Sequence, residues 1–153
     1  MIELQFSLHR NLTLLDFQWD TNRSESFSDD ADLYDIQAAK KILAKTSHPL
    51  IHIGFNRGTF KEQLSNIVID KSRAKQVNVE FPLIFRTDRF GVSYLIDGWH
   101  RLSKIDQIGQ TWVWAFMLSH LEGRKIRLPG GATYEVQEIA RTNWWTEDIR
   151  LSF

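Results

Sequence analysis

Residues 92–104 read VSYLIDGWHRLSK, and the fold and the candidate site are both best predicted from this stretch. Its first five residues are mostly apolar and typical of a short strand, and Asp97-Gly98 is typical of a tight turn. His100, Arg101 and Lys104 then fall at or just inside the start of a helix. Unpaired backbone N–H groups and partial positive charge at a helix N-terminus favour an anion. The stretch therefore predicts a site for a phosphate or a carboxylate.

The segments on either side extend this pattern. Apolar residues over 77–85 and a turn at 88–91 predict a hairpin whose second strand is 92–96. After the candidate site, Leu102, Ile105 and Ile108 recur at helical spacing, and Gly109 is expected to end that helix. Residues 112–118 are apolar on both faces of an extended chain, which predicts a central strand.

Helix signals also occur in the first half of the chain. Apolar residues at helical spacing predict a helix from Leu33 to Lys45, with Ser28-Asp29-Asp30 offering an N-cap. Thr59 and Glu62 fit a capping box, which predicts a short helix that continues through Ile67. Residues 70–76 are charged and are expected to be solvated.

Two histidines accompany the predicted strand 49–55. His48 and His52 are four residues apart, so they would share one face of that strand. The spacing leaves open a pair of metal ligands, but two histidines alone also fit simple packing or exposure. We therefore predict no metal site.

The C-terminal part is predicted to close the fold. Residues 128–132 (LPGGA) give a strong turn signal, and Tyr134 and Val136 suggest a last strand. Trp144 and Trp145 are expected to cover an edge of the core. Because strands and short helices are interleaved, we predict a single compact α+β domain over residues 1–153 with a mixed sheet, and 77–118 is its best-supported core.

Composition excludes several functions. The chain has 153 residues, of which 42% are hydrophobic and 25% are charged, as in ordinary soluble domains. Nineteen basic and nineteen acidic side chains cancel, which argues against a protein built mainly to bind nucleic acid. With no cysteine, the chain has no disulfide, thiolate metal site or cysteine nucleophile.

The sequence also predicts where the protein resides. The first residues, MIELQ, are neither basic nor continuously apolar, so no signal peptide is expected. No apolar run approaches the roughly 20 residues that span a bilayer. We therefore expect a cytoplasmic protein that does not bind membranes.

Residues 80–118 resemble the ParB/sulfiredoxin superfamily. Members of this superfamily often carry an I-D-G-x-H-R element at a strand-to-helix turn, followed by a glycine and a closing strand. Here IDGWHR covers residues 96–101, Gly109 follows, and 112–118 is the closing strand. The hairpin strand with Pro82 also matches the family pattern. The resemblance implies a stand-alone domain with the ParB/sulfiredoxin-like fold.

The resemblance also implies a nucleotide site at this corner. Sulfiredoxins use ATP, ParB proteins bind and hydrolyse CTP, and related free-serine kinases use ADP, so the implied ligand is one of these nucleotides with magnesium. His100 and Arg101 match the phosphate-contacting pair of the family. Asp97 and Gly98 match the turn that shapes the pocket.

This chain departs from the family at important positions. Sulfiredoxins have their reactive cysteine immediately before the His-Arg pair, where this chain has Trp99, so sulfur chemistry is excluded. The second arginine and the Glu-Asn-x-x-Arg motif of partition ParB proteins are both missing. Their helix-turn-helix domain is not expected either, so chromosome partition is not predicted.

Each candidate residue has a structural alternative. Asp97 could act as a base, bind magnesium, orient His100 or cap the helix. Arg101 could bind phosphate or form an ion pair with an acid such as Asp97, and Lys104 could reach the same anion or be solvated. Trp99 could stack on a base or lie in the core.

Two classes of function follow from these residues. The first is an enzyme, a nucleotide-dependent phosphotransferase or NTPase, with Asp97 and His100 as catalytic residues and Gly98, Trp99, His100, Arg101 and Lys104 binding the ligand. The second is a non-enzymatic module that uses the same pocket as a sensor or as a scaffold for a protein partner or a homodimer. DNA binding is disfavoured by the charge balance.

Overall fold

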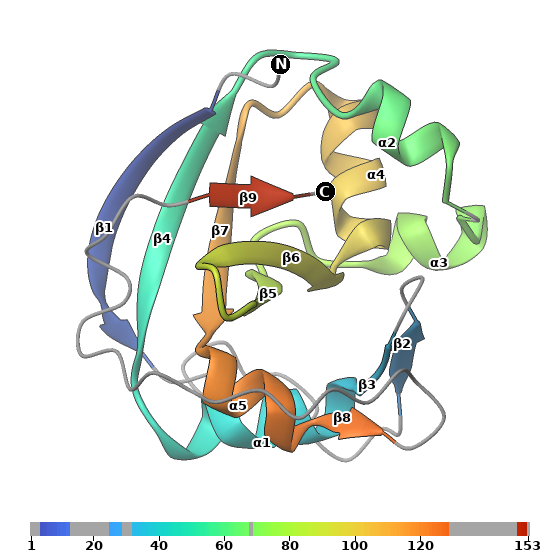
Figure 1. Ribbon diagram of the computed structural model, residues 1–153. Coiled ribbons are helices and arrows are strands. Elements are labelled where there is room, and N and C mark those ends of the chain that lie inside the picture. The colour runs from blue at the N-terminus through green and yellow to red at the C-terminus, as the bar shows by residue number, and fades with distance from the viewer. Residues whose placement is uncertain (1–3, 13–24, 29–31, 68, 129–149, 153) are drawn as a thin grey trace.

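Strand β7 (Trp112–Leu118) lies inside a six-stranded mixed sheet, between an antiparallel and a parallel neighbour (Figure 1). The computed structural model describes residues 4–12, 25–28, 32–67, 69–128 and 150–152. Across the sheet the order is β1 (Leu4–Leu12), β4 (His48–Phe55), β7, β5 (Leu83–Thr87), β6 (Val92–Asp97) and β9 (Arg150–Ser152). The predicted central position of 112–118 is therefore confirmed.

A second, smaller sheet and five helices complete the described part of the chain. The small sheet has the order β2 (Ser26–Ser28), β3 (Leu33–Asp35) and β8 (Arg127–Leu128). The helices are α1 (Ile36–Lys45), α2 (Lys61–Ser65), α3 (Lys71–Gln76), α4 (Trp99–Ile108) and α5 (His120–Lys125). The protein is a single compact α+β domain with a mixed sheet and short helices, as the sequence predicts.

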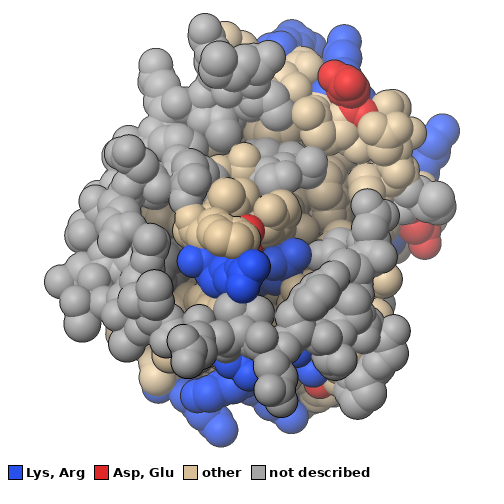
Figure 2. Space-filling view, viewed as in Figure 1, with Lys and Arg blue, Asp and Glu red and all other residues tan. Residues whose placement is uncertain are grey.

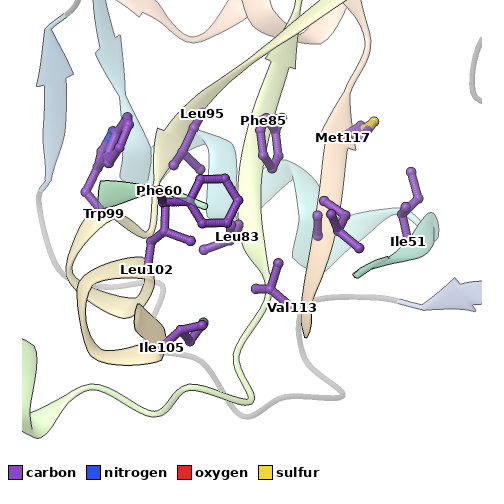
Figure 3. Close-up of a cluster of buried hydrophobic side chains, with 12 residues drawn as sticks. Ile51, Phe60, Leu83, Phe85, Leu95, Trp99, Leu102, Ile105, Val113 and Met117 are labelled. Atoms are coloured by element: carbon purple, nitrogen blue, oxygen red, sulfur yellow. The ribbon is translucent and has the colours of Figure 1, made fainter. Parts of the chain in front are cut away.

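The large sheet has a hydrophobic core on each face because its inner strands alternate two sets of apolar side chains. In β7, Val113, Ala115 and Met117 belong to one core, and Phe116 and Leu118 belong to the other. The first core also contains apolar residues from α4 and Phe60, which immediately precedes α2 (Figure 3). The second core is covered by α1.

The β5–β6 hairpin and the helix after it are confirmed. β5 and β6 pair antiparallel, and Asp88 Oδ1 accepts hydrogen bonds from the backbone N–H groups of Phe90 and Val92 at 2.8 and 3.0 Å. After α4 the chain returns as β7, parallel to β5. Helix α4 ends at Gly109, whose φ is +72°. Glycine adopts this conformation without the steric cost that a Cβ would add.

Two local predictions in the first half are wrong. Residues 33–35 form strand β3, and α1 begins only after Asp35, whose carboxylate accepts from the N–H of Ala38 at 3.0 Å. Thr59 does not cap α2, because its hydroxyl donates to the carbonyl of Asn56. Residues 71–76 form α3, which the sequence did not predict, but most of this charged segment is exposed, as expected.

The hairpin strand is also shorter than expected, since β5 begins at Leu83 and not at residue 77. The predicted strand at Tyr134 and Val136 lies outside the described residues, as do Trp144 and Trp145. Within the described part of the chain, no helix is long and apolar enough to cross a membrane.

Two groups of basic side chains lie on the face that Figure 2 shows. In the view of Figure 2, Lys and Arg lie near the middle of the face, where Figure 1 has the β5–β6 hairpin, and again below it, over α5 and β8.

Candidate functional site

The predicted corner between β6 and α4 is built on Gly98. This residue follows β6 directly and is the N-cap of α4, with a φ of +116°. A Cβ at this position would lie 2.4 Å from Cδ2 of Leu83 and 3.1 Å from Nη2 of Arg101. Both the backbone conformation and the packing therefore require glycine at the turn.

The start of α4 has no side-chain cap. Elsewhere in the described part of the chain, Asp35, Asp70 and Ser119 accept hydrogen bonds from the first turns of α1, α3 and α5. Gly98 has no side chain to do this, and the first turn of α4 contains no acidic residue. The positive end of the helix dipole is therefore not compensated by a cap, as the phosphate hypothesis requires.

Asp97 and Arg101 form a buried ion pair. Nη2 of Arg101 donates to Oδ2 of Asp97 at 2.9 Å, and the two side chains are 8% and 16% exposed. This is the structural alternative that the sequence left open for Arg101. The pair holds the end of β6 against the first turn of α4 and fixes the guanidinium of Arg101 beside the start of that helix.

His100 is half-buried beside the N-terminus of α3. Its Nε2 accepts a hydrogen bond from the backbone N–H of Asp70 at 3.3 Å, which leaves the proton of the neutral ring on Nδ1. Burial and the nearby charge of Arg73 lower the pKa of His100 below 6.5, against the opposing effect of Asp70 and Asp97. His100 is therefore neutral at pH 7 and offers Nδ1–H as a donor.

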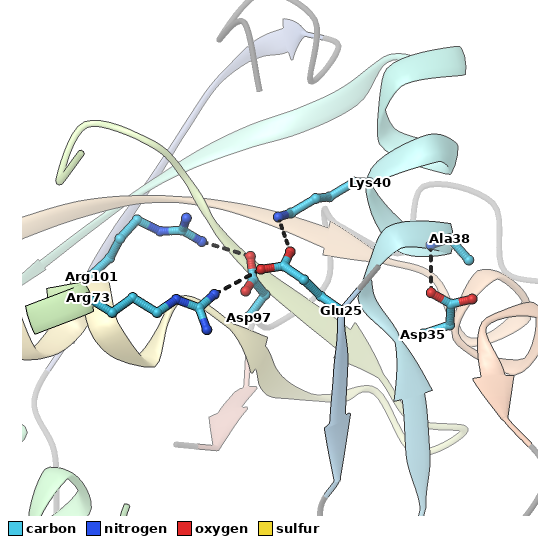
Figure 4. Close-up of polar contacts among 7 residues, drawn as sticks. All are labelled: Glu25, Asp35, Ala38, Lys40, Arg73, Asp97 and Arg101. Atoms are coloured by element: carbon cyan, nitrogen blue, oxygen red, sulfur yellow. Dashed lines mark hydrogen bonds and ion pairs between the residues drawn. The ribbon is translucent and has the colours of Figure 1, made fainter. Parts of the chain in front are cut away.

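A second set of charges adjoins the corner. Glu25 accepts hydrogen bonds from Nζ of Lys40 at 2.6 Å and from Nη2 of Arg73 at 2.8 Å (Figure 4). The charges of Arg73 and Asp97 both act on His100, so the two ion networks belong to one group. We call it the corner cluster, and its members are Glu25, Lys40, Asp70, Arg73, Asp97, His100 and Arg101. Three cations and three carboxylates then cancel while His100 is neutral.

The side chains of Lys104 and Trp99 stabilise the fold. Nζ of Lys104 donates to the carbonyls of Lys75 and Val77 at 3.0 and 2.8 Å, so it fastens the C-terminus of α3 to α4. Trp99 is 9% exposed and packs in the first core (Figure 3). Its buried Nε1 finds no hydrogen-bond partner in the described part of the chain. The structure therefore brings together Asp97, Gly98, His100 and Arg101, but not Lys104 or the ring face of Trp99.

The sequence reasoning missed Glu25, Lys40 and Arg73. Glu25 lies 15 residues from Lys40 and 48 from Arg73, so no local spacing connects them. One sequence pattern could have predicted the position of Arg73. Asp70 followed by Lys71, Ser72 and Arg73 fits an N-cap and the start of a helix.

The two histidines near β4 do not form a metal pair. His48 is bound to Glu122, while the ring of His52 stacks on Trp112 with centroids 5.7 Å apart and meets Trp114 edge-on at 5.1 Å. Among the described residues, no group of three or more His, Cys, Asp or Glu side chains could hold a metal ion.

The His48–Glu122 pair predicts a pH-dependent stability. Nδ1 of His48 lies 2.9 Å from the carbonyl of Thr46, and Nε2 lies 2.8 Å from Oε2 of Glu122. Burial alone lowers the pKa of His48, but the hydrogen bond and charge of Glu122 outweigh it and raise the pKa above 6.5. The contribution of His48 is therefore complete below pH 6.5 and is lost as the pH rises through the raised pKa.

Glu122, the partner of His48, affects the stability of the protein at acidic pH. Burial raises the pKa of Glu122, but its bonds to His48 and Ser119 lower it below 4.5, so its contribution is lost as the pH falls through the lowered pKa. We expect the wild type to be more stable than His48→Gln in urea unfolding. The difference in the free energy of unfolding should be largest between pH 4.5 and 6.5 and smaller above this range. A difference that stays constant with pH would contradict the ion pair.

Comparisons with protein-family models, with curated proteins and with solved structures find no match to this chain. The protein is therefore classified by its fold alone, as a single α+β domain with a mixed sheet. The relationship to the ParB/sulfiredoxin superfamily stays a prediction from residues 80–118.

Proposed function

We propose that this protein binds a phosphate-bearing ligand, most simply a nucleotide such as ATP, ADP or CTP with magnesium, at the N-terminus of α4. The observation that carries the proposal is the uncapped helix start at Gly98 beside the guanidinium groups of Arg73 and Arg101. Backbone N–H groups and the helix dipole attract an anion there. Arg73, whose side chain is 41% exposed, supplies a cation that can reach a bound phosphate.

Binding has more support than turnover. The carboxylate that could serve as a base or a magnesium ligand, Asp97, is in an ion pair with Arg101. His100 is the better candidate for a base, because its lowered pKa keeps it neutral and able to accept a proton at pH 7. A ligand-sensing or regulatory module is therefore the second candidate function, and the Asp97–Arg101 pair favours it over a phosphotransferase or NTPase.

Binding can be tested by isothermal titration with ATP, ADP and CTP, each with magnesium, and with inorganic phosphate. We expect Arg73→Gln to weaken the affinity for the tightest nucleotide about tenfold, because it removes one charge-assisted hydrogen bond. The matched control is Lys71→Gln, which removes an equal charge from an exposed position on the same helix. This control should change the affinity less than about twofold.

Two results would contradict the proposal. One is the absence of binding by every nucleotide and by phosphate at millimolar concentration. The other is equal weakening by Arg73→Gln and Lys71→Gln, because that would reflect overall charge and not a site. Release of phosphate from a bound nucleotide, lost in His100→Gln, would favour the enzyme over the sensor.

A further inference from the structure

A pocket of about 400 Å³ lies at the other end of the β5–β6 hairpin from the corner cluster. Four arginines line it: Arg86 and Arg89 from the hairpin, Arg124 from α5 and Arg127 from β8. Figure 2 shows basic side chains over these same elements. We call this the basic pocket. Its volume is in the range of sites for small molecules, about 300–1,000 Å³.

The acidic residues of the basic pocket have their own partners. Asp88 uses Oδ1 to hold the hairpin turn and accepts the hydroxyl of Tyr94 on Oδ2 at 3.2 Å. Asp32 accepts the hydroxyl of Tyr34 at 3.2 Å and lies 3.8 Å from Nη1 of Arg127. Among the lining residues that the structure describes, four arginines and two aspartates sum to a charge of +2.

Aromatic rings position two of the arginines. The guanidinium of Arg86 lies over the rings of both Tyr34 and Tyr94, 4.8 and 4.5 Å from their centroids. Arg89 lies 4.5 Å over the ring of Phe90, which is 61% exposed. Cation–π contacts of this kind hold a guanidinium in place and reduce the entropy lost when a ligand binds. Phe90 adds an exposed apolar surface beside these charges.

We infer that the basic pocket binds a small phosphomonoester whose phosphate is attached to a planar ring. A phosphomonoester carries close to two negative charges at neutral pH, which suits a pocket lined by four arginines. Guanidinium groups bind phosphate through paired N–H donors, and the exposed Phe90 can contact the ring. The inference does not depend on the corner cluster, because the two places share no residue.

Phenyl phosphate and inorganic phosphate are suitable probes, measured by isothermal titration against the full chain. We expect phenyl phosphate to bind at least several-fold more tightly than inorganic phosphate, and Phe90→Ala to remove this preference. The double variant Arg89→Gln/Arg124→Gln should weaken phenyl phosphate binding at least tenfold. Both arginines are exposed, so their replacement should leave the fold intact.

Control variants distinguish the pocket from other sources of anion binding. Lys125→Gln removes the same charge from the residue after Arg124, outside the pocket lining, and should change the affinity less than twofold. The titrations are repeated in the Arg73→Gln background, which weakens the proposed phosphate site at the start of α4, and the effect of the double variant should persist there. The inference is wrong if Lys125→Gln weakens binding as much as the double variant, or if the double variant has no effect in the Arg73→Gln background. It is equally wrong if phenyl phosphate fails to bind at millimolar concentration or binds no tighter than inorganic phosphate.

Discussion

Gly98→Ala is expected to lower the free energy of unfolding by about 3 kcal/mol, a large share of the stability of a domain of this size. One part of the loss is conformational, because the φ of +116° is costly for any residue with a Cβ. The other part is steric, since the new Cβ would lie 2.4 Å from Cδ2 of Leu83. Leu83 is fully buried and cannot move without disturbing the first core.

Gly58→Ala is the matched control for the steric part. Gly58 also has a positive φ, +80°, but a Cβ there would meet only the flexible side chain of Lys61 at 3.5 Å. We expect this variant to lose about 1 kcal/mol, the cost of the backbone conformation alone. Urea unfolding of both variants measures the difference. Equal losses would show that Leu83 yields to the new methyl group, and would contradict the tight packing of the corner.

Phosphate binding should fail with the Gly98 variant even where it remains folded. The orientation of the first-turn N–H groups of α4 depends on the sharp turn that the chain makes at Gly98, after Asp97. A shift of that turn misaligns the donors. Gly58→Ala, in contrast, should keep the wild-type affinity.

The elements that the sequence predicted correctly depend on residues close together in the chain. The hairpin follows from Asp88 and its turn, the end of α4 from Gly109, and the buried strand β7 from its apolar alternation. The prediction of helix starts was less successful, because several residues compete for each cap. Thr59 satisfied the capping-box pattern, yet the box occurs at Ser119 and Glu122.

The candidate site was predictable only in part for the same reason. Asp97, Gly98, His100 and Arg101 are neighbours in sequence, and the structure keeps them together. Lys104 has helical spacing from Arg101, but the chain folds α3 against α4 and supplies two backbone carbonyls that bind its ammonium group. Glu25 and the basic pocket join residues from distant segments, which no spacing rule connects.

Asp97→Ala is expected to cost about 3 kcal/mol of stability, because it leaves the guanidinium of Arg101 buried without its carboxylate partner. Replacing both partners with apolar residues, Asp97→Leu/Arg101→Met, should recover most of that loss, since a hydrophobic pair avoids the cost of burying two charges. Urea unfolding of the single and double variants gives the coupling between the two positions. A double variant as unstable as Asp97→Ala would contradict a simple ion pair.

The same double variant separates the structural role of this pair from its role in binding. If Arg101 only holds α4 against β6, the stable double variant should bind phosphate as well as wild type does. Under the proposed function, the charge of Arg101 also attracts the ligand, so the double variant should fold and yet bind about tenfold more weakly. Its charge loss is balanced, because one cation and one anion are removed together. Weakened binding would therefore reflect the missing guanidinium at the start of α4 and not a change in the net charge of the protein.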